Sequence, residues 1–160
     1  MTTFSEQYLA RTDEQRTDFL RSLDPDITLT DEDLTCVITD LHRTEDDQLQ
    51  IEIFQFLWDF FPTSPEAKDA VMSFIKQDNP DELVLSHAAM VLRHFTLTDE
   101  DFEAIYRSIE THRTNDYYQL SVDNLIRAIG LTLRQGSRPT ALKLLENGYI
   151  DQEWFSLYPA

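Results

Sequence analysis

Apolar residues recur at intervals of three and four along most of the chain, with polar residues between them. Leu34, Val37, Ile38 and Leu41 form one such face. This spacing places side chains on one side of an α-helix. No segment alternates strictly between apolar and polar residues for long enough to predict a strand. The pattern therefore predicts an all-α fold, with helices near 5–11, 13–23, 31–43, 45–61, 65–78, 80–95, 99–112, 115–135, 139–147 and 151–157.

Residues that favour helix ends stand beside these segments. Capping boxes, in which a threonine and a residue three positions later satisfy each other's backbone N–H groups, are expected at Thr12, Thr30, Thr44 and Thr98. Ser64-Pro65 and Asn79-Pro80 place proline at a first helical position. Further starts are expected at 114–116, at Ser137 or Pro139, and at Asp151, and ends at Pro62, Asn79, Gly136 and Gly148.

The helix starts are regularly spaced. When they are paired as 30/44, 64/79, 98/114 and 137/151, the pairs begin 34, 34 and 39 residues apart. The segment 29–34 (LTDEDL) recurs at 97–102 as LTDEDF, and Leu49, Phe54 and Leu57 align with Leu83, Ala88 and Val91. Such a period indicates a two-helix repeat.

The second helices contain small residues within apolar runs, in LSHAAMVLRHF at 85–95 and VDNLIRAIG at 122–130. In this respect the chain resembles HEAT-like helical repeats over residues 30–157. The resemblance implies a single domain, 1–160, folded as a short right-handed α-solenoid of about four stacked antiparallel helix pairs, with residues 1–29 as an N-terminal helical cap. The first copy departs from the pattern because it is rich in Phe. A compact irregular helical bundle is the alternative.

The repeat register also predicts a core. Matched apolar positions in three second helices are expected to be largely buried: Phe54, Leu57, Trp58, Phe61, Val91, Leu92, Phe95, Leu125 and Ile129.

Charge limits the possible partners. The chain of 160 residues has 30 acidic and 13 basic residues, which gives a net charge of -17 at pH 7. Such a field repels nucleic-acid phosphates and anionic membranes and attracts basic proteins. Cys36 is the single cysteine, and the sequence contains no apolar run of membrane-spanning length. We therefore expect a soluble cytoplasmic protein that binds neither nucleic acid nor membrane directly.

Signatures of catalysis and of cofactor binding are missing from the sequence. The three glycines are scattered, and there is no nucleophile elbow or metalloprotease motif. His42 and His112, near helix ends, are expected to interact with the last carbonyls, and His87 and His94 to pack or cap. The acidic runs near Thr30 and Thr98 are expected to cap helices rather than bind calcium. The sequence thus predicts a protein that is not an enzyme and has no cofactor or metal.

The remaining candidate is an interaction surface. The HEAT-like resemblance implies that the second helices line one face, where polar residues follow helical spacing. The residues expected to bind a partner are Asp46, Asp47, Glu52, Gln55, Asp59, Asp116, Tyr117, Tyr118 and Asp123.

Three functions are consistent with this surface. The leading hypothesis is an acidic module that masks a basic partner surface, because small acidic helical proteins of this kind resemble bacterial immunity or antitoxin proteins, inhibitors of a toxin such as a nuclease. The alternatives are a repeat scaffold or regulatory subunit whose acidity serves solubility, and a nucleic-acid mimic.

Overall fold

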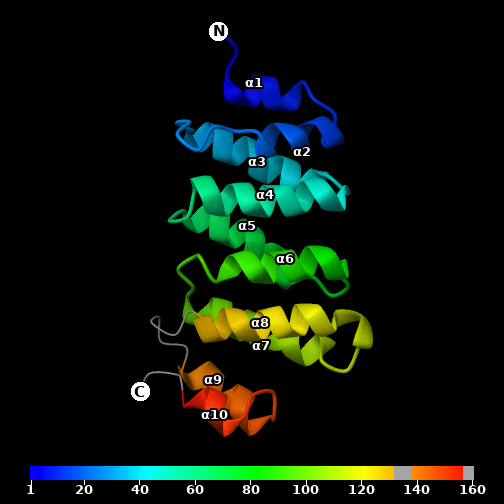
Figure 1. The fold of residues 1–160 in the computed structure, drawn as a ribbon, viewed down its shortest axis with the longest axis vertical. Coiled ribbons are helices and arrows are strands. Elements are labelled where there is room, and N and C mark those ends of the chain that lie inside the picture. Colours follow the sequence, from blue (N-terminus) through cyan, green and yellow to red (C-terminus); the bar gives the residue numbers. More distant parts are fainter. Residues whose placement is uncertain (132–137, 157–160) are drawn as a thin grey trace. The chain divides into compact units, whose positions relative to one another are not determined.

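The computed structural model describes residues 1–131 and 138–156, and within these ranges the chain forms α-helices and one short 3₁₀ helix but no strand (Figure 1). The predicted all-α class is therefore confirmed. The helices are α1 (Phe4–Leu9), α2 (Asp13–Arg21), α3 (Asp31–Arg43), α4 (Asp47–Phe60), α5 (Pro65–Ile75), α6 (Glu82–Leu92), α7 (Asp99–His112), the 3₁₀ helix η1 (Asp116–Tyr118), α8 (Gln119–Leu131), α9 (Arg138–Glu146) and α10 (Gln152–Phe155). They form two compact units, Met1–Ala70 and Val71–Ala160.

Capping explains where most helices begin. The predicted capping boxes at Thr12, Thr30 and Thr98 are present, and Asp151 caps α10. A further box, which the sequence pattern did not predict, joins Thr3 to Glu6. Each box satisfies backbone N–H groups that the first helical turn leaves without partners.

Two predicted starts are wrong. Thr44 ends α3 instead of opening α4, because its hydroxyl donates to Asp13 Oδ2 at 2.6 Å and Asp46 caps α4. The helix after Asn79-Pro80 begins two residues late, at Glu82, with Asp81 as its cap. The start near 114–116 is a 3₁₀ turn capped by Asn115. Gly136, Ser137 and the predicted helical residues 132–135 and 157 lie outside the described residues.

In the first unit α2 and α3 both pack against α4, and α1 packs against α2 and α3. Phe54 and Leu57 of α4 are fully buried, as predicted. Trp58 and Phe61 are only partly buried, which corrects their assignment to the core. Phe56 takes their place, since it is 2 % exposed and its ring lies 5.9 Å from that of Phe4 and 5.3 Å from that of Phe60.

A buried polar network links α1, α2 and α3 in the same unit. The Tyr8 hydroxyl donates to Asp40 Oδ2 at 2.6 Å, and Arg16 donates to Asp40 Oδ1 at 2.8 Å. Arg16 also donates to the backbone carbonyls of Tyr8 and Leu9, and the partly exposed Arg43 donates to Asp40. Burial, followed by the bond to Asp40, raises the pKa of Tyr8, so its hydroxyl stays protonated.

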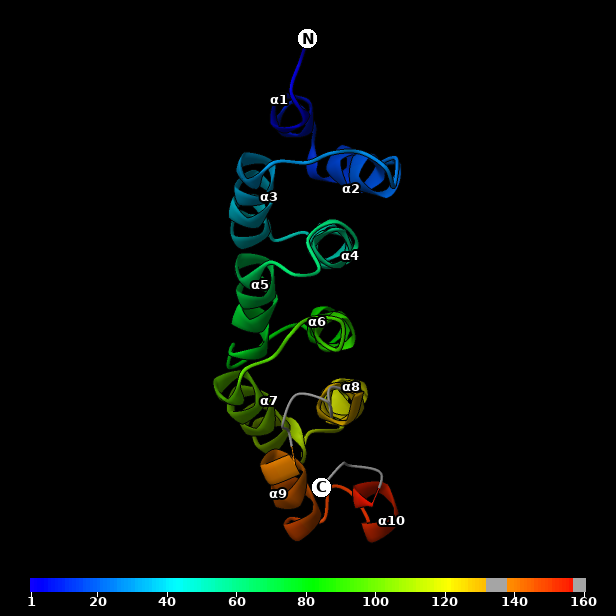
Figure 2. The same cartoon turned by 90° about the vertical axis from the view of Figure 1, so that its left-hand side faces the viewer.

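In the second unit α8 packs against α6, α7 and α9, and α9 packs against α7 and α10. Figure 2 shows α6 and α8 side by side in one layer, with α7 and α9 in the other. The predicted core residues of this unit, Val91, Leu92, Phe95, Leu125 and Ile129, are all buried, which confirms the periodicity of α6 and α8.

Polar side chains join α7 to the segment that follows α9. Tyr106 and Tyr149 donate from their hydroxyls to the two oxygens of Glu110, at 2.6 and 2.7 Å. These bonds, that of Tyr106 first, lower the pKa of Glu110. Burial, together with the same bond, raises the pKa of Tyr106 to about 12. The carboxylate is thus held as an acceptor between α7 and the segment that follows α9.

Gly148 ends α9 as predicted, in a left-handed conformation with φ of +76°. The N–H of Gly148 donates to the Leu145 carbonyl at 3.1 Å and that of Tyr149 to the Leu144 carbonyl at 2.9 Å. This pair of bonds is the Schellman motif, which favours glycine.

Gly148→Ala is expected to lower the free energy of unfolding by about 1–2 kcal/mol, the cost of left-handed backbone for an L-residue. A Cβ at this position would meet no atom within 4 Å, so crowding adds nothing. Urea denaturation would measure the change, and Gly148→Asn should cost less because asparagine tolerates this conformation. An alanine variant as stable as the native chain would contradict the prediction.

Candidate protein-binding surface

The nominated residues of the first unit are not equally available to a partner. Asp47 and Asp59 are exposed, and Gln55 donates to Asp59 Oδ1 at 3.0 Å. Asp46 accepts from the Leu49 N–H as the cap of α4. Glu52 accepts from Arg21 on α2, with a shortest contact of 3.1 Å. Asp46 and Glu52 therefore also make contacts within the fold.

The nominated residues of the second unit also differ in their exposure. Asp116, Tyr117 and Asp123 are exposed. Tyr118 is buried, with its hydroxyl donating to the Pro80 carbonyl at 2.6 Å and its ring 4.2 Å from that of His112. Tyr118 is thus a structural residue, because the turn of η1 directs it inward and its neighbour Tyr117 outward.

Polar contacts hold α6 and α8 together and set which side chains remain outside. Asn124 donates to Ser86 Oγ at 2.7 Å in the buried seam, and the Ser121 hydroxyl donates to Glu82 Oε2 at 2.6 Å. Tyr117 stands beside the start of α6, where its hydroxyl accepts from the Glu82 N–H at 3.5 Å. The beginnings of α6 and α8 are therefore adjacent.

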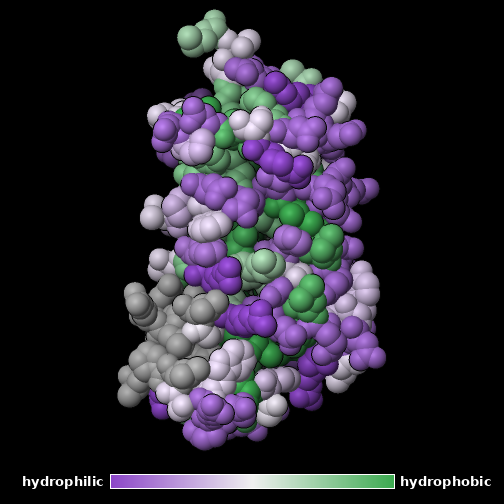
Figure 3. Space-filling model, in the orientation of Figure 1, coloured by the Kyte–Doolittle hydropathy of each residue, from purple (hydrophilic) through white to green (hydrophobic). Residues whose placement is uncertain are grey.

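Large apolar side chains are exposed to solvent on these same elements. Leu83 is 43 % exposed and Met90 is 40 % exposed, and they lie seven residues apart on α6, on one face of the helix. Tyr117 of η1 is 57 % exposed, and Leu120, in the first turn of α8, is 56 % exposed. We call these four residues the α6–α8 patch. Figure 3 shows hydrophobic groups over α6 and α8 between hydrophilic ones.

The charged groups around the patch are mostly acidic. Asp81, Asp116 and Asp123 are exposed beside it, and Arg127 follows on α8. An apolar centre with a polar rim is the composition of protein interfaces, and Tyr and Met are among the residues enriched there. This surface can contact apolar side chains of a partner at its centre and basic side chains at its edge.

Sequence reasoning found Tyr117 and two residues of the rim but missed the other apolar residues of the patch. Asp116, Tyr117 and Asp123 were expected at the surface, whereas Leu83 was aligned with Leu49, which is fully buried. Both residues lie in the first turn of their helices, so the alignment matches their positions but not their surroundings: Leu49 is fully buried, whereas Leu83 is 43 % exposed. Exposure of an apolar residue within an apolar helix has no signal in the sequence.

The histidines do not form a site together. His87 Nδ1 lies 2.8 Å from the Leu83 carbonyl, and His112, which was expected to interact with the end of its helix, is instead buried against Tyr118. In the part of the chain that the structure describes, no three His, Cys, Asp or Glu side chains cluster so as to hold a metal ion. Nor does any helix in 1–131 or 138–156 have the length and apolar character needed to cross a membrane.

Comparison of the chain with protein-family models, with curated proteins and with solved structures finds no match. The class of the protein therefore rests on its fold and surface: an acidic, all-α protein with an apolar patch on adjacent helices.

Proposed function

We propose that the chain is a non-enzymatic protein-binding module that uses the α6–α8 patch and its acidic rim. The observation that carries this proposal is the exposure of four large apolar side chains on three elements of one unit, α6, η1 and α8, beside three carboxylates. Exposed apolar groups that gather on one face commonly mark an interaction site.

The architecture we propose for the module is a HEAT-like right-handed solenoid. It is supported by the 34-residue spacing of helix starts and by the pair α7 and α8, which run in opposite directions (Figure 1). Repeat proteins of this type bind along extended faces of stacked helices.

The partner we propose is a basic protein, masked by this module as an immunity or antitoxin protein masks a toxin such as a nuclease. Support comes from the net charge of -17 and from the carboxylates at the edge of the patch. Charge of this kind accelerates association with a cationic partner and makes it sensitive to salt.

A second candidate is a scaffold or regulatory subunit whose acidity serves solubility. The apolar centre of the patch favours this function, because a scaffold would contact its partner mainly through apolar side chains. Such binding depends little on salt. The two candidates differ in the salt concentration at which a bound partner is released.

Substitution within the patch should weaken partner binding without unfolding the chain. We expect Tyr117→Ala combined with Leu120→Ser to weaken partner binding at least about tenfold, since buried aromatic anchors contribute most of the affinity in protein interfaces. The measurement is retention of proteins from the native cell on the immobilised chain, followed by the affinity of each retained protein.

Leu142→Ser is the matched control, because Leu142 is also an exposed leucine of the second unit but lies on α9. Proteins retained by the native chain and the Leu142 variant but lost by the patch variant support the proposal. An identical set on all three chains contradicts it. Asp116→Asn with Asp123→Asn should lower the salt concentration of release if the basic-partner function is right and leave it unchanged for the scaffold.

A further inference from the structure

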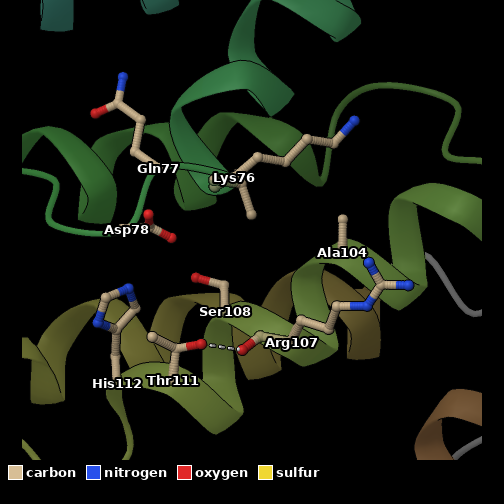
Figure 4. Close-up of a pocket in the computed structure, with 9 residues that line it drawn as sticks. Lys76, Gln77, Asp78, Ala104, Arg107, Ser108, Thr111 and His112 are labelled. Carbon is tan, nitrogen blue, oxygen red and sulfur yellow. Dashed lines mark hydrogen bonds between the residues drawn. The ribbon is translucent and has the colours of Figure 1, made fainter.

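A pocket of about 250 Å³ lies in the second unit, between the segment that follows α5 and one face of α7. Lys76 and Asp78 line it from that segment, and Arg107, Ser108, Thr111 and His112 line it from α7 (Figure 4). No residue of this pocket belongs to the α6–α8 patch or to its rim.

Ser108 has an unusual hydroxyl. Its side chain is buried, the residue being 5 % exposed, and its Oγ has no hydrogen-bond partner in the described part of the chain. Several other helical hydroxyls bond to the carbonyl four residues earlier, as Thr111 does to Arg107 at 2.8 Å and Thr35 to Asp31 at 2.9 Å. Ser108 instead directs its hydroxyl off the helix into the pocket (Figure 4). A buried hydroxyl left unpaired is costly, so a group from outside the chain is expected to bond to it.

The charges of the pocket are divided between its two ends. Figure 4 shows the side chains of Lys76 and Arg107 extending to one side, near Ala104, while the Asp78 carboxylate lies on the other, facing Ser108. Within the described residues, Lys76, Asp78 and Arg107 form no salt bridge. Each of these charged groups is therefore available to a ligand.

His112 completes the end that holds Asp78. The residue is buried, and this burial lowers the pKa of its imidazole, while the charge of Glu82 acts in the opposite direction. The ring is consequently neutral at pH 7 and can donate one hydrogen bond or accept one. It adds polarity to this end without adding a positive charge.

We propose that this pocket binds a small zwitterion, of the class of free α-amino acids. The ligand carboxylate would pair with the Arg107 guanidinium, which suits a planar carboxylate, and with Lys76. The ligand ammonium would donate to Asp78 and to Ser108 Oγ. A simple anion would meet the Asp78 carboxylate, and a simple cation would leave Arg107 and Lys76 unpaired, so only a ligand with both charges matches the two ends.

The test is calorimetric titration of the whole chain with each of the common free L-amino acids, and with acetate and ethylammonium as the two halves of the ligand. We expect saturable binding of at least one amino acid, and binding at least about tenfold weaker for acetate and ethylammonium. Arg107→Gln and Asp78→Asn should each weaken the amino acid at least about tenfold, and Ser108→Ala, which suits a helix, should weaken it also.

Arg127→Gln and Glu100→Gln are the matched controls, since both residues are exposed in the same unit and neither lines the pocket. Unchanged affinity in these two variants, with loss in the pocket variants, supports the proposal. It is overturned if no amino acid binds, if acetate binds as tightly as the best amino acid, or if Asp78→Asn leaves the affinity unchanged.

Discussion

Replacing Asp40 with alanine is expected to lower the free energy of unfolding by about 3–5 kcal/mol. Asp40 is 2 % exposed and receives hydrogen bonds from Tyr8, Arg16 and Arg43. Its removal leaves the guanidinium of the buried Arg16 with only the more distant carboxylate of Asp13, 3.5 Å away, and the Tyr8 hydroxyl without its acceptor. The loss exceeds the strength of any one bond, because a buried charge without a partner is more costly than the pair was favourable. Urea denaturation monitored by circular dichroism would measure it.

An exposed ion pair in the same unit provides the control. Asp18 lies 3.9 Å from Arg21, and both side chains are well exposed. Asp18→Ala should change the free energy of unfolding by less than about 1 kcal/mol, as pairs in water usually do. If Asp40→Ala lowered the free energy of unfolding as little as Asp18→Ala, the network would not stabilise the packing of α1, α2 and α3.

Phe56→Ala is expected to lower the free energy of unfolding by about 3–5 kcal/mol, the usual cost of truncating a buried phenylalanine. The ring of Phe56 contacts those of Phe4, Phe60 and Phe61, with centroids 5.9, 5.3 and 5.8 Å away. Truncation removes apolar contact area and leaves a cavity among these aromatic residues. The measurement is again the free energy of unfolding in urea.

Trp58→Ala distinguishes the structure from the sequence pattern, which assigned Trp58 to the core. Because Trp58 is only partly buried, its truncation should cost less than that of Phe56, although tryptophan is the larger side chain. The reverse order would show that the register of α4 follows the repeat pattern rather than the packing described above.

Local interactions account for most of what the sequence predicted correctly. The caps at Thr12, Thr30 and Thr98 and the stop at Gly148 depend on residues within one turn of each other. Thr44 shows the limit of this reasoning: its spacing to Asp47 matches a capping box, but its hydroxyl bonds to Asp13, 31 residues away. A competing long-range partner has no signature in the local sequence.

The candidate binding surface was predicted only in part. Helical spacing correctly placed Asp116, Tyr117 and Asp123 outside, but Tyr118 is buried because η1 is a 3₁₀ turn rather than the first turn of a long α-helix. Leu83, which the repeat alignment matched with the buried Leu49, is exposed, and so is Met90. The sequence could not show that the Ser108 hydroxyl lacks a hydrogen-bond partner, because this depends on its rotamer and on the segment that faces α7.

The sequence by itself determined the all-α class, most helix starts and the acidic character of the surface, because capping, helical periodicity and net charge depend on residue type and short spacing. Only the tertiary structure decided which apolar residues are buried, which carboxylates hold a helix or an arginine, and which polar groups enclose a pocket. These features depend on the neighbour that each helix face meets, and periodicity specifies a face without specifying what covers it.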